Sequence, residues 1–147
     1  MLTRKLGFSA LLTAVYKRLM DTPLLCSGKT LLFYNHVPAN TAYPYHVIGK
    51  LMGVRSAEFT TRDTAGEDNA FQIDSWVDQT SGLGDKACSD MQNTIIQSLT
   101  ASALDIENYY AIHFYLDYAE IMLDPENPEL FLRHGLLRFR QDMSPTS

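Results

Sequence analysis

The spacing of apolar residues divides the chain into two predicted helices and about five predicted strands. Apolar residues recur every three or four positions over residues 8–20 and 84–99, the period of an amphipathic helix. Shorter runs of apolar and aromatic residues predict strands at residues 31–34, 46–54, 70–79, 108–123 and 129–141. The order α-β-β-β-α-β-β predicts one α+β domain over residues 1–147, an antiparallel sheet of about five strands packed with both helices.

Two segments interrupt the periodic pattern. Residues 56–69 are polar and have no regular period, which predicts a long hairpin loop between two strands. Residues 142–147 form a short polar end that we expect to be frayed. Glycines at positions 49 and 53 interrupt the strand at 46–54 and predict a bulge or a close approach by another backbone there.

Composition limits the class of protein. The chain has 147 residues, of which 46% are apolar and 20% charged, enough to bury a core without a metal or disulfide. No apolar run approaches the roughly 18 residues of a membrane span. Lys17 and Arg18 argue against a signal peptide, and the isolated Cys26 and Cys88 favour reduced cysteines in the cytosol.

The net charge of −5 is unevenly distributed. Residues 1–56 carry seven cations and one anion, whereas residues 57–147 carry five cations and sixteen anions. The two parts sum to +6 and −11. An acidic protein is a poor general ligand for nucleic acid. The split either reflects complementary surfaces on neighbouring copies or is a chance distribution of surface charge.

The sequence offers no convincing active site. No phosphate-binding loop is present, and the four histidines, one per segment, lack metal-ligand spacing. A triad could be drawn from Ser75 or Cys88 with His113 and Asp117, but no nucleophile elbow surrounds either nucleophile. The acids of the 56–69 loop lie on a segment unsuited to fixed catalytic geometry. We therefore predict a protein that is not an enzyme, with no catalytic residue, cofactor or metal.

Polar and aromatic residues on the faces predicted to lie outside the core favour self-assembly instead. Trp76 is notable, because it lies among acids on the polar face of its strand, where a helix end or another subunit would bury it. The candidate interface residues are Arg62, Asp63, Glu67, Asp68, Trp76, His113, Tyr115, Arg138 and Arg140.

A series of short motifs follows the predicted helix at residues 8–20. The first are Val37-Pro38 and the segment Tyr43-Pro44-Tyr45-His46-Val47-Ile48-Gly49. Thr61-Arg62-Asp63 with Gly66, a strand ending at Trp76, and a helix ending in Ile95 and Leu99 come next. In order and spacing, most of residues 8–100 resembles the tail-completion, or tail terminator, proteins of tailed bacteriophages, which join tail to head.

The resemblance implies a homo-oligomeric ring, usually a hexamer, at the head-proximal end of the virion tail. Such a ring stops polymerisation of the tail tube protein and docks the head connector or stopper protein. DNA passes through its lumen without specific binding, no membrane is involved, and assembly takes place in the host cytoplasm. The 56–69 loop would contact a neighbouring subunit or the tube. The alternatives are a head-completion connector ring (adaptor or stopper) and a small α+β enzyme or ligand-binding regulator.

Overall fold

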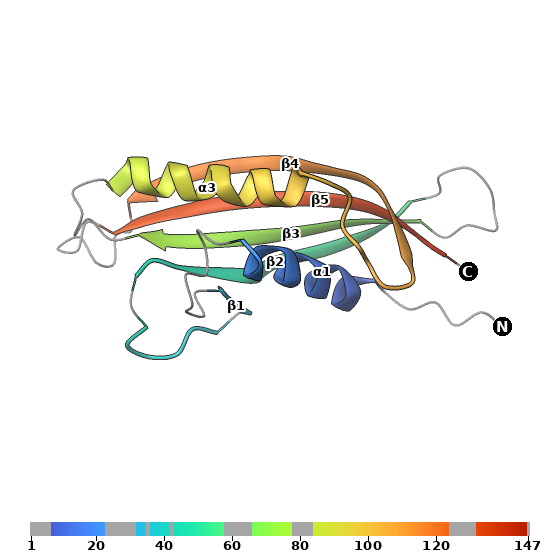
Figure 1. Cartoon of the computed structure of the whole chain (residues 1–147), viewed down its shortest axis with the longest axis horizontal. Coiled ribbons are helices and arrows are strands. Elements are labelled where there is room, and N and C mark those ends of the chain that lie inside the picture. Colours follow the sequence, from blue (N-terminus) through green and yellow to red (C-terminus); the bar gives the residue numbers. More distant parts are fainter. Residues whose placement is uncertain are drawn as a thin grey trace.

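The computed structural model of the chain describes residues 7–22, 32–34, 36–41, 43–57, 66–77, 84–123 and 132–146, with the backbone alone for residues 50–57. These residues form two helices and five strands in the predicted order (Figure 1). The helices are α1 (Phe8–Met20) and α3 (Gly84–Thr100). The strands are β1 (Leu32–Tyr34), β2 (Tyr45–Ala57), β3 (Gly66–Val77), β4 (Tyr109–Leu123) and β5 (Arg133–Pro145).

The five strands form one sheet in the order β1-β2-β3-β5-β4, so β1 and β4 lie at its edges. Three of the four strand pairs are antiparallel as predicted, but β1 runs parallel to β2. The predicted α+β fold class is confirmed, and the sheet is mixed rather than purely antiparallel. A tight hairpin makes neighbouring strands antiparallel, so β1 and β2 are not joined as a hairpin.

The hairpin between β2 and β3 differs most from the sequence prediction. Arg55 pairs with Asp68 and Ala57 with Gly66, so both strands continue into the segment expected to be a loop. Glu67 is only 1% exposed, and it accepts hydrogen bonds from the Gly7 amide at 3.0 Å and from Asn69 Nδ2 at 3.3 Å. Polar side chains can be buried when they are paired in this way. The predicted loop over 56–69 is wrong at both ends, and residues 58–65 lie outside the described part of the chain.

The C-terminal end is also ordered where fraying was expected. β5 continues to Pro145, and Met143 is completely buried in the core. The Thr146 amide donates to the carbonyl of Asn108 at 3.0 Å. The prediction of a frayed end is wrong for these residues, because pairing with β3 and β4 compensates for the polar composition. The bulge predicted in β2 is confirmed: its register shifts between Ile48 and Met52, and Gly49 has a φ of 98°.

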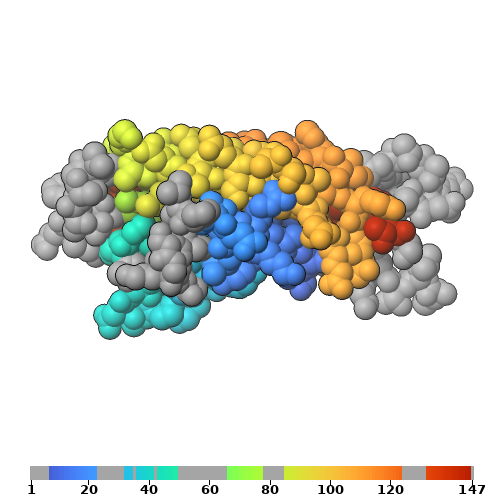
Figure 2. Space-filling model, in the orientation of Figure 1, coloured from blue at the N-terminus to red at the C-terminus, as the bar shows by residue number. Residues whose placement is uncertain are grey.

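Both helices pack on the same face of the sheet and lie side by side there (Figures 1 and 2). Their apolar stripes meet Phe71 and Phe139, whose rings stack at 5.5 Å. Arg18 of α1 donates to the carbonyls of Ser98, Ser102 and Ala103 at 2.8–3.2 Å. It supplies the cation that the C-terminal end of α3 lacks in its own last turn. The other face of the sheet is covered by neither helix.

Candidate assembly surface

The sheet face opposite α1 and α3 is called the open face below. Along β5, side chains alternate between buried residues under the helices and partly exposed residues on the open face. The registers of β3 and β4 place every second residue of β3 and part of the polar and aromatic residues of β4 on the same side. The open face includes Asp68, Gln72, Asp74 and Trp76 of β3, His134, Arg138, Arg140 and Asp142 of β5, and His113, Tyr115, Tyr118 and Glu120 of β4.

At one end of the open face, four rings form an aromatic ladder across three strands and the segment before β2. Tyr43 stacks on Tyr45 at 5.3 Å, and Tyr45 stacks on Trp76 at 5.5 Å. Trp76 then stacks on His134 at 4.4 Å with only 7° between the ring planes. Trp76 is thus partly covered within its own chain, by rings of β2 and β5 instead of by a helix end.

A buried carboxylate fixes the histidine of this ladder. Asp74 is fully buried, and its Oδ1 lies 2.5 Å from Nε2 of His134. Gln72 Nε2 donates to both oxygens of Asp74, at 3.0 and 2.9 Å. A buried carboxylate without such partners would cost several kcal/mol. Asp74, which Gln72 holds in place, therefore fixes His134 in one orientation against Trp76.

At the opposite end, Arg140 connects acids from β3 and β4. Its Nη1 donates to Oδ2 of Asp68 at 2.8 Å, and its Nε lies 3.6 Å from Oδ2 of Asp117. The hydrogen bond to Asp68 raises the pKa of Arg140. Burial, and next the charge of Asp68, raises the pKa of Asp142 beside it. The arginine therefore partly neutralises an acidic cluster.

The second arginine of the open face also has a partner within the sheet. The guanidinium of Arg138 lies 5.8 Å from the centroid of the Tyr118 ring. Tyr118 donates its hydroxyl hydrogen to Glu120 at 2.8 Å, and this hydrogen bond raises the pKa of Tyr118. Both described arginines of this face are thus engaged by acidic or aromatic side chains.

The structure brings most of the predicted interface residues together. Asp68, Trp76, His113, Tyr115, Arg138 and Arg140 share the open face. Glu67 does not, because it points under the helices and binds the Gly7 amide. Arg62 and Asp63 lie outside the described residues. A role of these residues in an interface stays a prediction.

The triad drawn from the sequence does not assemble. Ser75 lies under the helices and shares a hydrogen bond of 2.7 Å with Nδ1 of His46. Its β5 partner is Gly135, whereas His113 pairs with Asp142, seven residues or about 23 Å further along β5. Burial raises the pKa of the Cys88 thiol to about 11, so this cysteine is not a reactive thiolate at neutral pH.

The described residues also hold no group of three or more metal-ligating side chains, and none of the described helices is long and apolar enough to cross a membrane.

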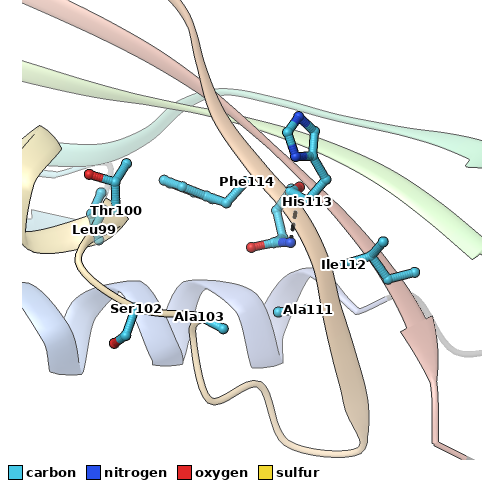
Figure 3. A pocket seen from close by; sticks show the side chains of 9 residues that line it. Leu99, Thr100, Ser102, Ala103, Ala111, Ile112, His113 and Phe114 are labelled. Atoms are coloured by element: carbon cyan, nitrogen blue, oxygen red, sulfur yellow. Dashed lines mark hydrogen bonds between the residues drawn. The ribbon is translucent and has the colours of Figure 1, made fainter.

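A pocket of about 230 Å³ lies where the turn after α3 meets the start of β4 (Figure 3). Its lining includes Leu99, Ala103, Ala111 and Phe114, with Gln141 of β5 beneath. The Gln141 amide nitrogen donates to the His113 carbonyl at 3.1 Å, at the point where β4 bulges. Its fully buried Oε1 has no hydrogen-bond partner among the described residues.

Sequence reasoning missed Asp74 with His134, and Gln141. The sequence contained only a weak signal for these residues. Each is a polar residue inside a strand in which polar and apolar positions alternate, as many solvent-facing residues are. The pairing of β3 with β5, which skips β4, is needed to bring Asp74 and His134 together.

The family model of the tail completion protein gp17 matches residues 13–143. The chain therefore belongs to the tail completion protein gp17 family, and it is a structural protein of tail assembly and not an enzyme.

A solved structure has the same fold. A chain of the virion of the native gene transfer agent (GTA) particle superimposes with a TM-score of 0.78 at 19% sequence identity. The match covers 96% of this chain and 99% of that chain. A search of curated protein sequences gives no match.

Proposed function

We propose that this protein forms a ring, with six copies as the expected number, on the head-proximal end of a phage tail tube. There it stops polymerisation of the tube protein and presents the surface to which the head connector or stopper protein docks. Assembly would take place in the host cytoplasm, and the ring would remain in the virion. Family membership and the fold shared with a chain of a phage-like particle support this proposal.

The observation that carries the ring is the distribution of charge across the sheet. The segment 32–57, which contains β1 and β2, has two cations and no acid. At the opposite edge, residues 101–123 have four acids and no lysine or arginine. Opposite charge at the two edges of one sheet favours a head-to-tail contact between copies, and such contacts close into rings when the rotation permits.

The open face suits a lumen through which DNA slides. Arg140 is ion-paired with Asp68 and Asp117, and the guanidinium of Arg138 lies over the Tyr118 ring, so acidic side chains offset part of the positive charge of this face. A surface whose cations are offset by acids gains less of the counterion-release energy that holds DNA. A connector of the adaptor class, the alternative from the sequence, tends to be mainly helical, whereas this domain is built on a five-stranded sheet.

Electron microscopy of particles that lack this protein tests the function. We expect overlong tails that remain separate from the heads. Tails of normal length joined to heads would contradict the proposal. Unjoined but normally capped tails would favour a head-completion connector.

Residues 58–65 connect β2 and β3 and carry Arg62 and Asp63, which we propose contact a neighbouring subunit or the tube. The double charge reversal Arg62→Glu with Asp63→Lys is expected to lower the yield of joined particles and to leave the unfolding free energy unchanged. An unchanged yield would remove this role from the segment. The reversal of an exposed pair elsewhere, Lys86→Glu with Asp90→Lys, is the matched control.

A further inference from the structure

β4 presents a long edge with no partner strand in the described part of the chain. It has 15 residues, and two bulges interrupt its pairing with β5. Four large apolar or aromatic side chains on it are exposed to 45–62%: Tyr110, Ile112, Tyr118 and Leu123. A long edge strand with exposed apolar side chains is a template for a strand from another molecule.

On the other side of the sheet, part of β2 also lacks a partner strand among the described residues. β1 pairs with only three residues of β2, His46, Val47 and Ile48. From Met52 to Ala57, β2 pairs with β3 on one side, and no described strand pairs with its other side. The second half of β2 can therefore also accept a strand.

The two free edges lie at the same level along the strands. Arg55 of β2 pairs with Asp68 of β3, Asp68 with Asp142 of β5, and Asp142 with His113 of β4. Three successive antiparallel pairings also make β2 and β4 run in opposite directions. A copy rotated about an axis along the strands would therefore place its β2 antiparallel to β4, in the arrangement of a closed sheet.

The charges of the two edges identify the partner as a second copy of this chain. β2 carries Lys50 and Arg55 and no acid, whereas β4 carries Asp117 and Glu120 and no lysine or arginine. Two β4 edges would repel each other, and two β2 edges likewise. Only the pairing of unlike edges brings opposite charges together.

We propose that β4 of one copy pairs antiparallel with residues 52–57 of the next copy, so that the sheets join edge to edge around the ring. This inference rests on the proposed ring and names its contact. The pocket lined by Ala111 and Phe114 lies at the same level of β4. Edge-to-edge joining would cover the second half of β2 and the facing first part of β4, which carries the exposed Tyr110 and Ile112.

Disulfide cross-linking tests the contact. In a background with Cys26→Ser and Cys88→Ala, Ala57→Cys is combined in turn with Tyr110→Cys, His113→Cys or Tyr115→Cys, which the register places on one face. The control combines Ala57→Cys with Leu123→Cys, ten residues or about 33 Å from His113 along β4. Each variant is checked for native circular dichroism and for its oligomer by mass photometry, alone and bound to purified tail tubes, before oxidation.

We expect at least one of the three combinations to give a ladder of covalent multimers up to the ring size, with at least a tenfold lower yield from the control. A ring in which none of the three cross-links overturns the edge pairing while the proposed function stands. Covalent dimers from His113→Cys alone would show β4 paired with β4 and would also overturn it. No oligomer, either alone or on tubes, would overturn the ring and the edge pairing together.

Discussion

His46 is a buried titrating group whose effect on stability can be worked out from the structure. Its side chain is 1% exposed under the helices, and its Nδ1 lies 2.7 Å from Oγ of Ser75. Burial disfavours the charged imidazolium and lowers the pKa of His46 from 6.5 to about 4. The folded protein therefore keeps this histidine neutral well into the acidic range.

The lowered pKa makes folding depend on pH in one direction. Between pH 6.5 and 4 the unfolded chain binds a proton at His46 that the folded chain does not, so the free energy of unfolding falls as the pH falls. The difference between 6.5 and about 4, at roughly 1.4 kcal/mol per pH unit, gives a loss of about 3 kcal/mol. The stability at stake is fully present above pH 6.5, where His46 is neutral in the folded and the unfolded chain, and it is lost by about pH 4.

The assay is urea unfolding at pH 7.5, 6.5, 5.5 and 4.5, followed by circular dichroism, for the wild type and for His46→Gln. Glutamine can still bond to Ser75 but does not titrate. We expect the wild type to lose about 2–3 kcal/mol more than the variant between pH 7.5 and 4.5. His36→Gln, at an exposed histidine, is the matched control and should retain the wild-type slope. Equal pH slopes for the wild type and His46→Gln would refute the reasoning.

Three further changes follow from single contacts. Trp76→Ala should lower the unfolding free energy by more than about 1 kcal/mol, because Tyr45 and His134 lose their stacking partner. Trp76→Phe should lower it less, and a loss below about 1 kcal/mol for Trp76→Ala would contradict the aromatic ladder. Glu67→Ala should lower the unfolding free energy by about 1–3 kcal/mol, because it leaves the Gly7 amide unbonded. Glu107→Ala, at an exposed acid, should lower it by under about 0.5 kcal/mol, and equal losses would refute a stabilising role of the Glu67–Gly7 hydrogen bond. Gly135→Ala should lower the unfolding free energy by about 1–3 kcal/mol, because its Cβ would lie 2.7 Å from Cys88 Sγ and 2.9 Å from Gln92 Nε2. Adding Cys88→Ala should recover part of this loss, and a double variant whose loss equals the sum of the two single losses would contradict the clash.

The helices were predictable because their signal is local. α1 has the predicted bounds and α3 extends one residue beyond them, since an amphipathic period and a neighbouring proline or glycine can be recognised within one segment. The strands were found, but their ends were not. Glu67 and Asp68 look like loop residues, but inside the sheet they bond to Gly7 and Arg140, which are distant in sequence.

The candidate surface was predictable in part, because the alternation of polar and apolar residues along a strand is also a local signal. Period-two alternation placed Trp76 and Arg138 away from the core, although it could not show that β5 lies between β3 and β4. That strand order decides that His134 meets both Trp76 and Asp74, and that Arg140 reaches acids of two strands. No local pattern contains this information, because each contact joins segments with independent sequences.

The sequence by itself determined the number, type and order of the elements, the lack of a catalytic motif and the imbalance of charge between the two parts of the chain. These properties depend on neighbouring residues or on simple sums. Only the tertiary structure decided where the imbalance lies. The strand order carries the basic β2 to one side of the sheet and the acidic β4 to the other. Strand pairing over long separations is selected by the packing of the whole core, so the placement of charge on opposite edges becomes visible only in the folded sheet.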